Sequence, residues 1–199
     1  ISGKSGIVVA HMGSGSKGLN LINEVLEDTE IPIRTIRPTH VNREENLLIQ
    51  AFDYAKRGGI IDLTCGIYEH LSPSNVIERA EKEGVPLENI AVSSDGYGSW
   101  SRYDEYGNLV KIGVSPVSSL FAELQNMVLE NNFGLEKALQ FFTTNVAKAL
   151  NLYPKKGHID LGADADLLII DNNMDLVSVI AKGKLMLDER KLLVKGTYE

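Results

Sequence analysis

Short apolar runs alternate with helical patterns along the first hundred residues of the chain. The runs lie at 7–11, 31–40, 60–65 and 90–94. Apolar residues spaced three and four apart follow the first three runs, over 19–29, 47–58 and 72–84. This spacing is typical of helices that bury one face. The pattern therefore predicts repeated βα units whose strands form a parallel sheet.

The predicted strands end at His11, His40, Cys65 and Asp95, at intervals of 29, 25 and 30 residues. Such intervals suit the βα units of either a barrel or a doubly wound sheet. A closed eightfold barrel takes about 250 residues, however, and only four units are present. Either the sheet is open or half of a barrel is missing. In the second case, we expect another polypeptide to pair with the free strand edges.

The pattern changes after the fourth strand. Residues 101–114 alternate around a Tyr-Gly-Asn turn and predict a hairpin or lid, and two helices are expected near 116–131 and 135–151. From about Gly157 onward, short apolar runs are separated by Gly and Asn, which is typical of small antiparallel strands. The chain therefore predicts two units, residues 1–156 and a mostly β module over 157–199.

Charge and cysteine content narrow the class of protein. Twenty basic against 27 acidic residues give a net charge of −7, without a basic run that could neutralise nucleic-acid phosphates. No apolar run approaches the roughly 18 residues that span a bilayer. The one cysteine, Cys65, excludes a disulfide framework within the chain, and we expect it in the core. These features favour a cytoplasmic protein that binds neither nucleic acid nor membrane.

Three predicted strand ends carry side chains that can bind a metal: His11, His40 and Asp95. Sites assemble at the carboxyl ends of parallel strands, and imidazole nitrogen and carboxylate oxygen are good zinc ligands. A histidine that ends a buried strand is also commonly a hydrogen-bonded core residue. The strand-end positions therefore leave a metal site and a packing role open.

Two further residues lie near these strand ends. Ser99 follows Asp95 across two glycines that let the backbone turn tightly, although an Asx turn would explain the same stretch. Arg43 follows His40 by three residues, where its guanidinium could bind a carboxylate with two hydrogen bonds. A helix-surface ion pair with Glu44 or Glu45 explains Arg43 equally well.

The stretch GHIDLGADADLLIID, residues 157–171, resembles the closing signature of the amidohydrolase superfamily. Read with VVAHMG, RPTHVNR and SSDGYGS, the whole chain is similar to the C-terminal half of the superfamily members that hydrolyse β-aspartyl (isoaspartyl) dipeptides. The resemblance implies an α/β fold. Residues 1–156 would form the second half of a metal-dependent TIM (β/α)8 barrel, strands five to eight with the closing helices, and 157–199 part of a small β-sandwich-like domain.

The resemblance also implies roles for individual residues. His11 and His40 would bind one metal of a pair, and Asp95 would bind the other and act as general acid and base. Arg43 and Ser99 would contact the dipeptide substrate. The reaction implied is hydrolysis by a hydroxide that bridges two divalent ions, with zinc as the expected metal.

The same resemblance implies what this chain lacks. Family members carry a His-x-His pair and a carbamylated lysine that bridges the metals, both upstream of the part that this chain matches. We therefore expect the N-terminal half of the same protein as a partner, a homo-oligomer as the assembly, and an inactive chain without that half. Two alternatives stay open: another amidohydrolase, either a cyclic amidase or a deacylase, and a half-barrel without catalytic function.

Overall fold

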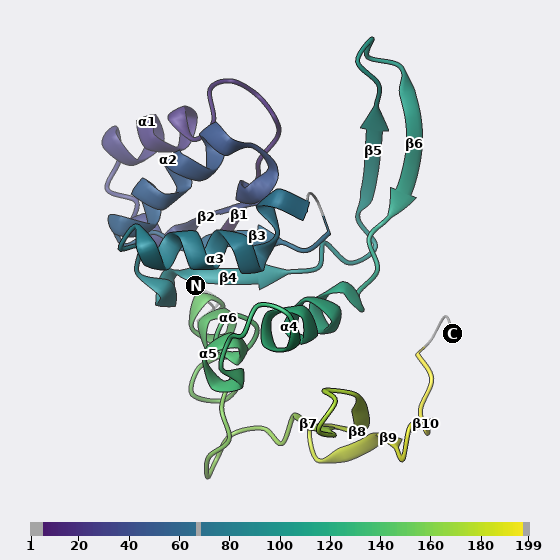
Figure 1. The fold of residues 1–199 in the computed structure, drawn as a ribbon. Coiled ribbons are helices and arrows are strands. Elements are labelled where there is room, and N and C mark those ends of the chain that lie inside the picture. The colour runs from purple at the N-terminus through teal and green to yellow at the C-terminus, as the bar shows by residue number, and fades with distance from the viewer. Residues whose placement is uncertain (1–5, 67–68, 197–199) are drawn as a thin grey trace.

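The computed structural model describes residues 6–66 and 69–196. The start of the predicted unit 1–156 and the end of the predicted unit 157–199 therefore lie outside the described residues. Its centre is a parallel sheet of four strands in the order β1-β2-β3-β4, which matches the predicted βα repeats (Figure 1). The strands are β1 (Val8–His11), β2 (Ile36–Thr39), β3 (Ile61–Thr64) and β4 (Ile90–Ser93). Strands that are neighbours in the sheet also follow one another in the chain, which is the strand order of a partial (β/α)8 barrel.

Three helices cover one face of this sheet (Figure 1): α1 (Asn20–Glu27), α2 (Glu45–Lys56) and α3 (Pro73–Lys82). The start of α3 follows directly from its sequence, because the Ser72 side chain accepts a hydrogen bond from the Asn75 amide and Pro73 occupies the first turn. The connections also contain four short 3-10 turns, at Ile33–Thr35, Val41–Arg43, Glu69–Leu71 and Leu87–Asn89. The run at 31–40 is thus a strand only over its last part.

The core lies between the sheet and these helices. Ile61 and Leu63 of β3 are fully buried there with Leu48 and Phe52 of α2. Cys65 is also buried in this cluster, as expected, and burial raises the pKa of its thiol to about 12. Because side chains alternate along a strand, Asp62 belongs to the opposite, inner face of the sheet.

The two edges of the parallel sheet differ. Val8 and Val9 of β1 are each about half exposed, at 53% and 52%, and β1 pairs only with β2 among the described strands. On the other edge, the Val92 amide of β4 donates to the Phe141 carbonyl at 3.1 Å, and the Asn145 side chain donates to the Ile90 carbonyl at 2.8 Å. The open edge expected of a partial barrel is therefore found at β1.

The prediction of one helix over 135–151, in the segment that covers the edge of β4, was wrong. In place of a single helix over 135–151, the chain forms α5 (Leu135–Leu139) and α6 (Thr144–Ala149), after α4 (Ser119–Leu129). Thr143, between the two, has φ −126° and ψ −83°, which is outside the helical region. The break leaves the Phe141 carbonyl free to accept from β4. A continuous helix would have used that carbonyl within its own ladder.

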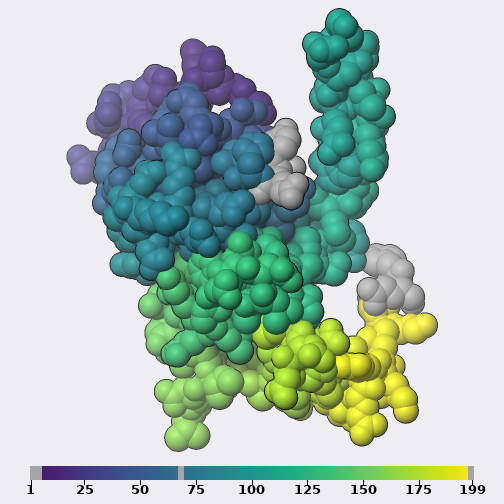
Figure 2. Space-filling model, viewed as in Figure 1, coloured from purple at the N-terminus to yellow at the C-terminus, as the bar shows by residue number. Residues whose placement is uncertain are grey.

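The predicted hairpin is present as β5 (Ser99–Tyr103) and β6 (Leu109–Val114), and it stands away from the body of the protein (Figures 1 and 2). Its strands are exposed almost throughout. Trp100 lies across Gly113 of the facing strand, where any side chain would meet the indole ring. The hairpin begins directly after the Asp95 turn, so it extends from the carboxyl end of β4.

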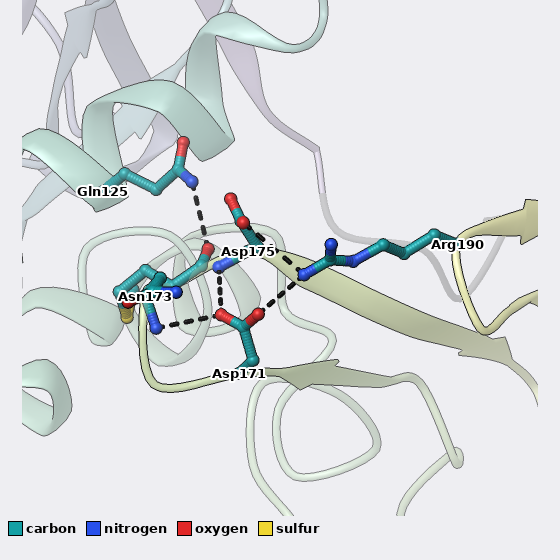
Figure 3. A network of polar contacts seen from close by, with 6 residues as sticks. Gln125, Asp171, Asn173, Asp175 and Arg190 are labelled. Atoms are coloured by element: carbon teal, nitrogen blue, oxygen red, sulfur yellow. Dashed lines mark hydrogen bonds and ion pairs between the residues drawn. The ribbon is translucent and has the colours of Figure 1, made fainter.

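The last part of the chain forms the expected antiparallel module, in the order β10-β9-β8-β7. The Gln125 side chain of α4 donates a hydrogen bond to the Met174 carbonyl of this module at 3.0 Å (Figure 3). Within the module, the Asp171 carboxylate accepts from the Asn173 and Asp175 amides and forms an ion pair with Arg190. Its strands are β7 (Leu167–Ile170), β8 (Leu176–Ala181), β9 (Lys184–Asp188) and β10 (Lys191–Leu192). No helix within 6–66 and 69–196 is both long and apolar enough to cross a membrane.

Candidate metal and substrate site

The structure brings two of the predicted residues into direct contact. His11 ends β1 and His40 follows β2, and the register pairs His11 with Thr39. His11 Nδ1 lies 3.0 Å from His40 Nε2, with the ring centroids 5.0 Å apart. His40 has φ 63° and ψ 29°, a left-handed conformation that ends the strand and starts the following turn. Two imidazole nitrogens from neighbouring strands therefore meet at one point.

His40 is held from its other side by β3. Its Nδ1 lies 2.8 Å from the Thr64 hydroxyl, and both residues are buried. Asn42, also buried, accepts from the Thr64 amide at 2.8 Å and donates to the Thr64 carbonyl at 2.9 Å. Neither Thr64 nor Asn42 was predicted to belong to the site, although Asn42 lies inside the RPTHVNR motif. Their contacts depend on the pairing of β2 with β3, which a single strand does not reveal.

The electrostatics of His40 reflect these neighbours. Burial is the largest influence and lowers its pKa, and the positive charges of Arg43 and His11 lower it further. The carboxylate of Asp95 acts in the opposite direction. A lowered pKa keeps the imidazole neutral near pH 7, which is the form that binds a metal. His11, Arg43 and Asp95 thus all lie near enough to His40 to act on its charge.

Asp95 lies two residues beyond β4 in a tight, strained turn. Its φ is 50°, and its carbonyl accepts from the Gly98 amide at 2.7 Å. A Cβ on Gly98 would lie 2.4 Å from Asp95 Oδ1, so the carboxylate rests directly against that glycine. No group of three His, Cys, Asp or Glu side chains within the described residues is placed to hold a metal ion. The contact between the two histidines therefore does not include Asp95.

Asp62 is a further carboxylate near the site that was not predicted from the sequence. It accepts from the hydroxyls of Thr39 and, at 2.7 Å, Ser93, which belong to the neighbouring strands. Burial raises the pKa of Asp62 to about 6, against the effect of these two donors, and the charge of Asp95 raises it further. Asp62 lies between the buried residues Ile61 and Leu63, and a carboxylate at the alternate position of an apolar strand was the signal that the sequence offered. Asp62 thus links the strands that carry His40 and Asp95.

The two predicted substrate residues are placed differently. The Arg43 amide donates to the His40 carbonyl at 3.1 Å, and its side chain is half-buried. The alternative ion pair is not formed: Glu45 pairs with Arg79, and no carboxylate of the described residues pairs with Arg43. Ser99 is exposed at the start of β5, and no hydrogen bond within the described part of the chain joins its hydroxyl to either imidazole. Among the described residues, the Arg43 guanidinium therefore has no carboxylate partner, and it lies close enough to His40 to lower the pKa of that imidazole.

The donor set fits one side of a divalent metal centre. Two imidazole nitrogens 3.0 Å apart suit ligands that meet one ion at about 2.0–2.1 Å each. A catalytic zinc ion takes three protein ligands and keeps one position open. The histidine pair could therefore supply two ligands of such an ion, and further ligands would have to come from other residues.

Comparison with known proteins identifies relatives of the whole chain. The model of the amidohydrolase family matches residues 22–186. The structure of a β-aspartyl dipeptidase from Fervidobacterium islandicum AW-1 in complex with a β-Asp-Leu dipeptide is similar, with a TM-score of 0.89 and 38% identity over 99% of this chain and 52% of that protein. A second structure of β-aspartyl dipeptidase from that organism gives a TM-score of 0.83 at 36% identity, over 99% of this chain and 50% of that one.

The chain is also similar, over a shorter stretch, to a hydantoinase. The D-hydantoinase of Geobacillus stearothermophilus is 34% identical over 82 residues, which are 41% of this chain and 16% of that enzyme. The chain spans about half the length of the two β-aspartyl dipeptidase structures.

Proposed function

This chain belongs to the amidohydrolase family, and we propose that it supplies half of the active site of a metal-dependent β-aspartyl dipeptidase. The observation that carries the proposal is the contact between His11 Nδ1 and His40 Nε2 at the carboxyl ends of adjacent parallel strands. The choice of substrate is supported by the likeness, over nearly the full chain, to a structure that contains a β-Asp-Leu dipeptide. Zinc is the metal proposed, because neutral imidazole suits it.

Each residue has a task in the proposed reaction. His11 and His40 would hold one divalent ion, and Arg43 would bind the free carboxylate of the dipeptide by a charge-assisted pair. Asp95 would take a proton from the attacking water and return it to the leaving amine. Ser99 would contact the substrate from the base of the hairpin. A bound metal supplies Lewis-acid polarisation of the scissile carbonyl and a lowered pKa for water.

The proposal includes a partner that completes the barrel. This part of the proposal is supported by the exposed β1 edge and by a donor set of only two histidines among the described residues. We propose that the N-terminal half of the same protein pairs with β1 and carries the second metal site with its bridging carbamylated lysine. Assembly as a homo-oligomer and a cytoplasmic location are part of the same proposal.

Metal analysis and a substrate panel on the complete enzyme test this function. We expect His11→Ala and His40→Ala each to lower bound zinc, measured by elemental analysis after gel filtration. The variant His158→Ala, which changes a histidine of the segment before β7, is the matched control and should keep the metal. Unchanged metal content in both site variants would return the two histidines to a packing role.

The panel compares β-Asp-Leu with α-Asp-Leu, a hydantoin and an N-acetyl amino acid. Preferential hydrolysis of β-Asp-Leu is expected. The second candidate, a cyclic amidase, rests on the partial match to D-hydantoinase. Faster turnover of the hydantoin would favour that alternative.

A further inference from the structure

Thr64 forms a contact with His40 that the proposed reaction does not yet use. The Thr64 hydroxyl lies 2.8 Å from His40 Nδ1, on the side of the ring opposite the nitrogen that faces His11. Thr64 is 2% exposed and His40 5% exposed, so water does not compete for this bond. The end of β3, where sequence predicted no ligand, thus contacts the ring of a predicted ligand.

Asn42 holds the backbone of the residue that carries this hydroxyl. Its amide side chain bonds to both the backbone N–H and the carbonyl of Thr64, and it donates a further bond to the Leu71 carbonyl at 2.8 Å. Asn42 is fully buried, and it lies two residues after His40 in the chain. The turn that carries His40 is therefore joined to the end of β3 by one side-chain bond to the ring and two to the backbone.

The Thr64 hydroxyl can accept from a protonated Nδ1 of His40 or donate to a bare one. A neutral imidazole has one N–H and one bare nitrogen, and the hydrogen bond at one nitrogen decides which is which. When Nδ1 carries the proton, it donates to the Thr64 oxygen and Nε2 is left bare. His40 Nε2 is the atom that meets His11 Nδ1.

We propose that Thr64 is a positioning residue: its hydroxyl, anchored by Asn42, holds the His40 proton on Nδ1 and presents Nε2 as the metal ligand. The proposal rests on the proposed function, because it assigns Nε2 to a metal. It adds a residue on β3 to the site. Partners of this kind typically change metal affinity by about 10–100-fold when they are removed.

The test uses a pair of substitutions in the complete enzyme. Thr64→Val keeps the shape of the side chain and removes the hydroxyl, whereas Thr64→Ser keeps the hydroxyl. We expect Thr64→Val to raise the Kd for Zn²⁺, measured by competition with a chromogenic chelator, by about 10–100-fold. Thr64→Ser should stay close to the unsubstituted enzyme. Thr144→Val removes a hydroxyl at the start of α6 that bonds to the Gly157 carbonyl, and it should leave the Kd unchanged.

A second readout reports the tautomer without a metal. In protein labelled with ¹⁵N-histidine and stripped of metal by EDTA, long-range ¹H–¹⁵N spectra distinguish Nδ1–H from Nε2–H rings. The His40 signal, assigned by its loss in His40→Ala, should show Nδ1–H in the unsubstituted protein and in Thr64→Ser. A shift of population toward Nε2–H is expected in Thr64→Val.

The outcomes separate this inference from the proposed function. Equal Zn²⁺ affinity and equal tautomers in Thr64→Val and the unsubstituted enzyme would overturn the positioning role while leaving the metal site standing. Equal weakening in the valine and serine variants would assign the effect to packing and overturn it as well. If His40→Ala leaves Zn²⁺ binding intact, the proposed function fails, and the inference fails with it.

Discussion

Asp62→Asn removes an ionisable group from the inner face of the sheet while keeping nearly the same shape. The hydroxyls of Thr39 and Ser93 both bond to one oxygen, Oδ2, of the Asp62 carboxyl. An asparagine carbonyl can accept both of these bonds. The substitution therefore isolates the charge of Asp62 from its role as an acceptor.

The size of the effect follows from the pKa. Burial raises the pKa of Asp62 from its ordinary value of 3.8 to about 6. The native state then binds the proton more tightly than the unfolded chain, so stability is greatest below about pH 4 and falls as the pH rises to about 6. A difference of about two pKa units corresponds to a loss of about 3 kcal/mol, which stays constant at higher pH.

Urea unfolding from pH 4 to pH 8 measures this loss. The protein is kept metal-free with a chelator, because a bound cation would change the pKa of nearby carboxyl groups. We expect the stability of Asp62→Asn relative to the unsubstituted protein to rise by about 2.5 kcal/mol between pH 4 and pH 7, because the unfolded chain has already lost part of this proton at pH 4. Titration of groups that do not interact with Asp62 cancels in this difference.

Two results would refute the reasoning. Parallel pH profiles for the two proteins would mean that Asp62 titrates normally and is not desolvated. A relative stability of Asp62→Asn that falls with rising pH would mean that the charged carboxylate is stabilised by its donors, with the opposite sign. Equal m-values are needed for either comparison.

Three further predictions concern the complete enzyme and the fold. Arg43→Ala should lower kcat/KM for β-Asp-Leu by roughly 100-fold, about 3 kcal/mol, because a charge-assisted pair is lost, and an equal loss on an uncharged amide would contradict that role. Asp95→Ala should lower turnover by about 10²–10⁴-fold while zinc persists at the histidine pair, as elemental analysis would show; loss of all metal would contradict it. Gly157→Ala should lower the free energy of unfolding, measured by urea titration, by about 1–3 kcal/mol. Gly157 has a φ of +87°, and a new Cβ would lie 2.6 Å from Ala147 Cβ and 2.9 Å from the Thr143 carbonyl oxygen. Unchanged stability would contradict that packing.

Local features of the sequence were sufficient to predict most of the elements. Apolar periodicity identified the βα units, Ser72 and Pro73 marked the start of α3, and the Tyr-Gly-Asn turn marked the hairpin. These signals are local because helix caps and tight turns depend on neighbouring residues. The position of His11 and His40 at strand ends also followed from the sequence alone. The closing signature at 157–171 indicated the family, which the match over residues 22–186 confirms.

Only the tertiary structure decided which residues support those histidines. Thr64 and Asp62 belong to an apolar run that reads as an ordinary buried strand, and their partners lie more than twenty residues away in the chain. Likewise, the break between α5 and α6 coincides with the hydrogen bond that the Phe141 carbonyl accepts from the edge of β4. Each of these contacts depends on the register between strands or on an unpaired strand edge. Periodicity along one segment carries no information about register with another segment, so these features required the folded chain.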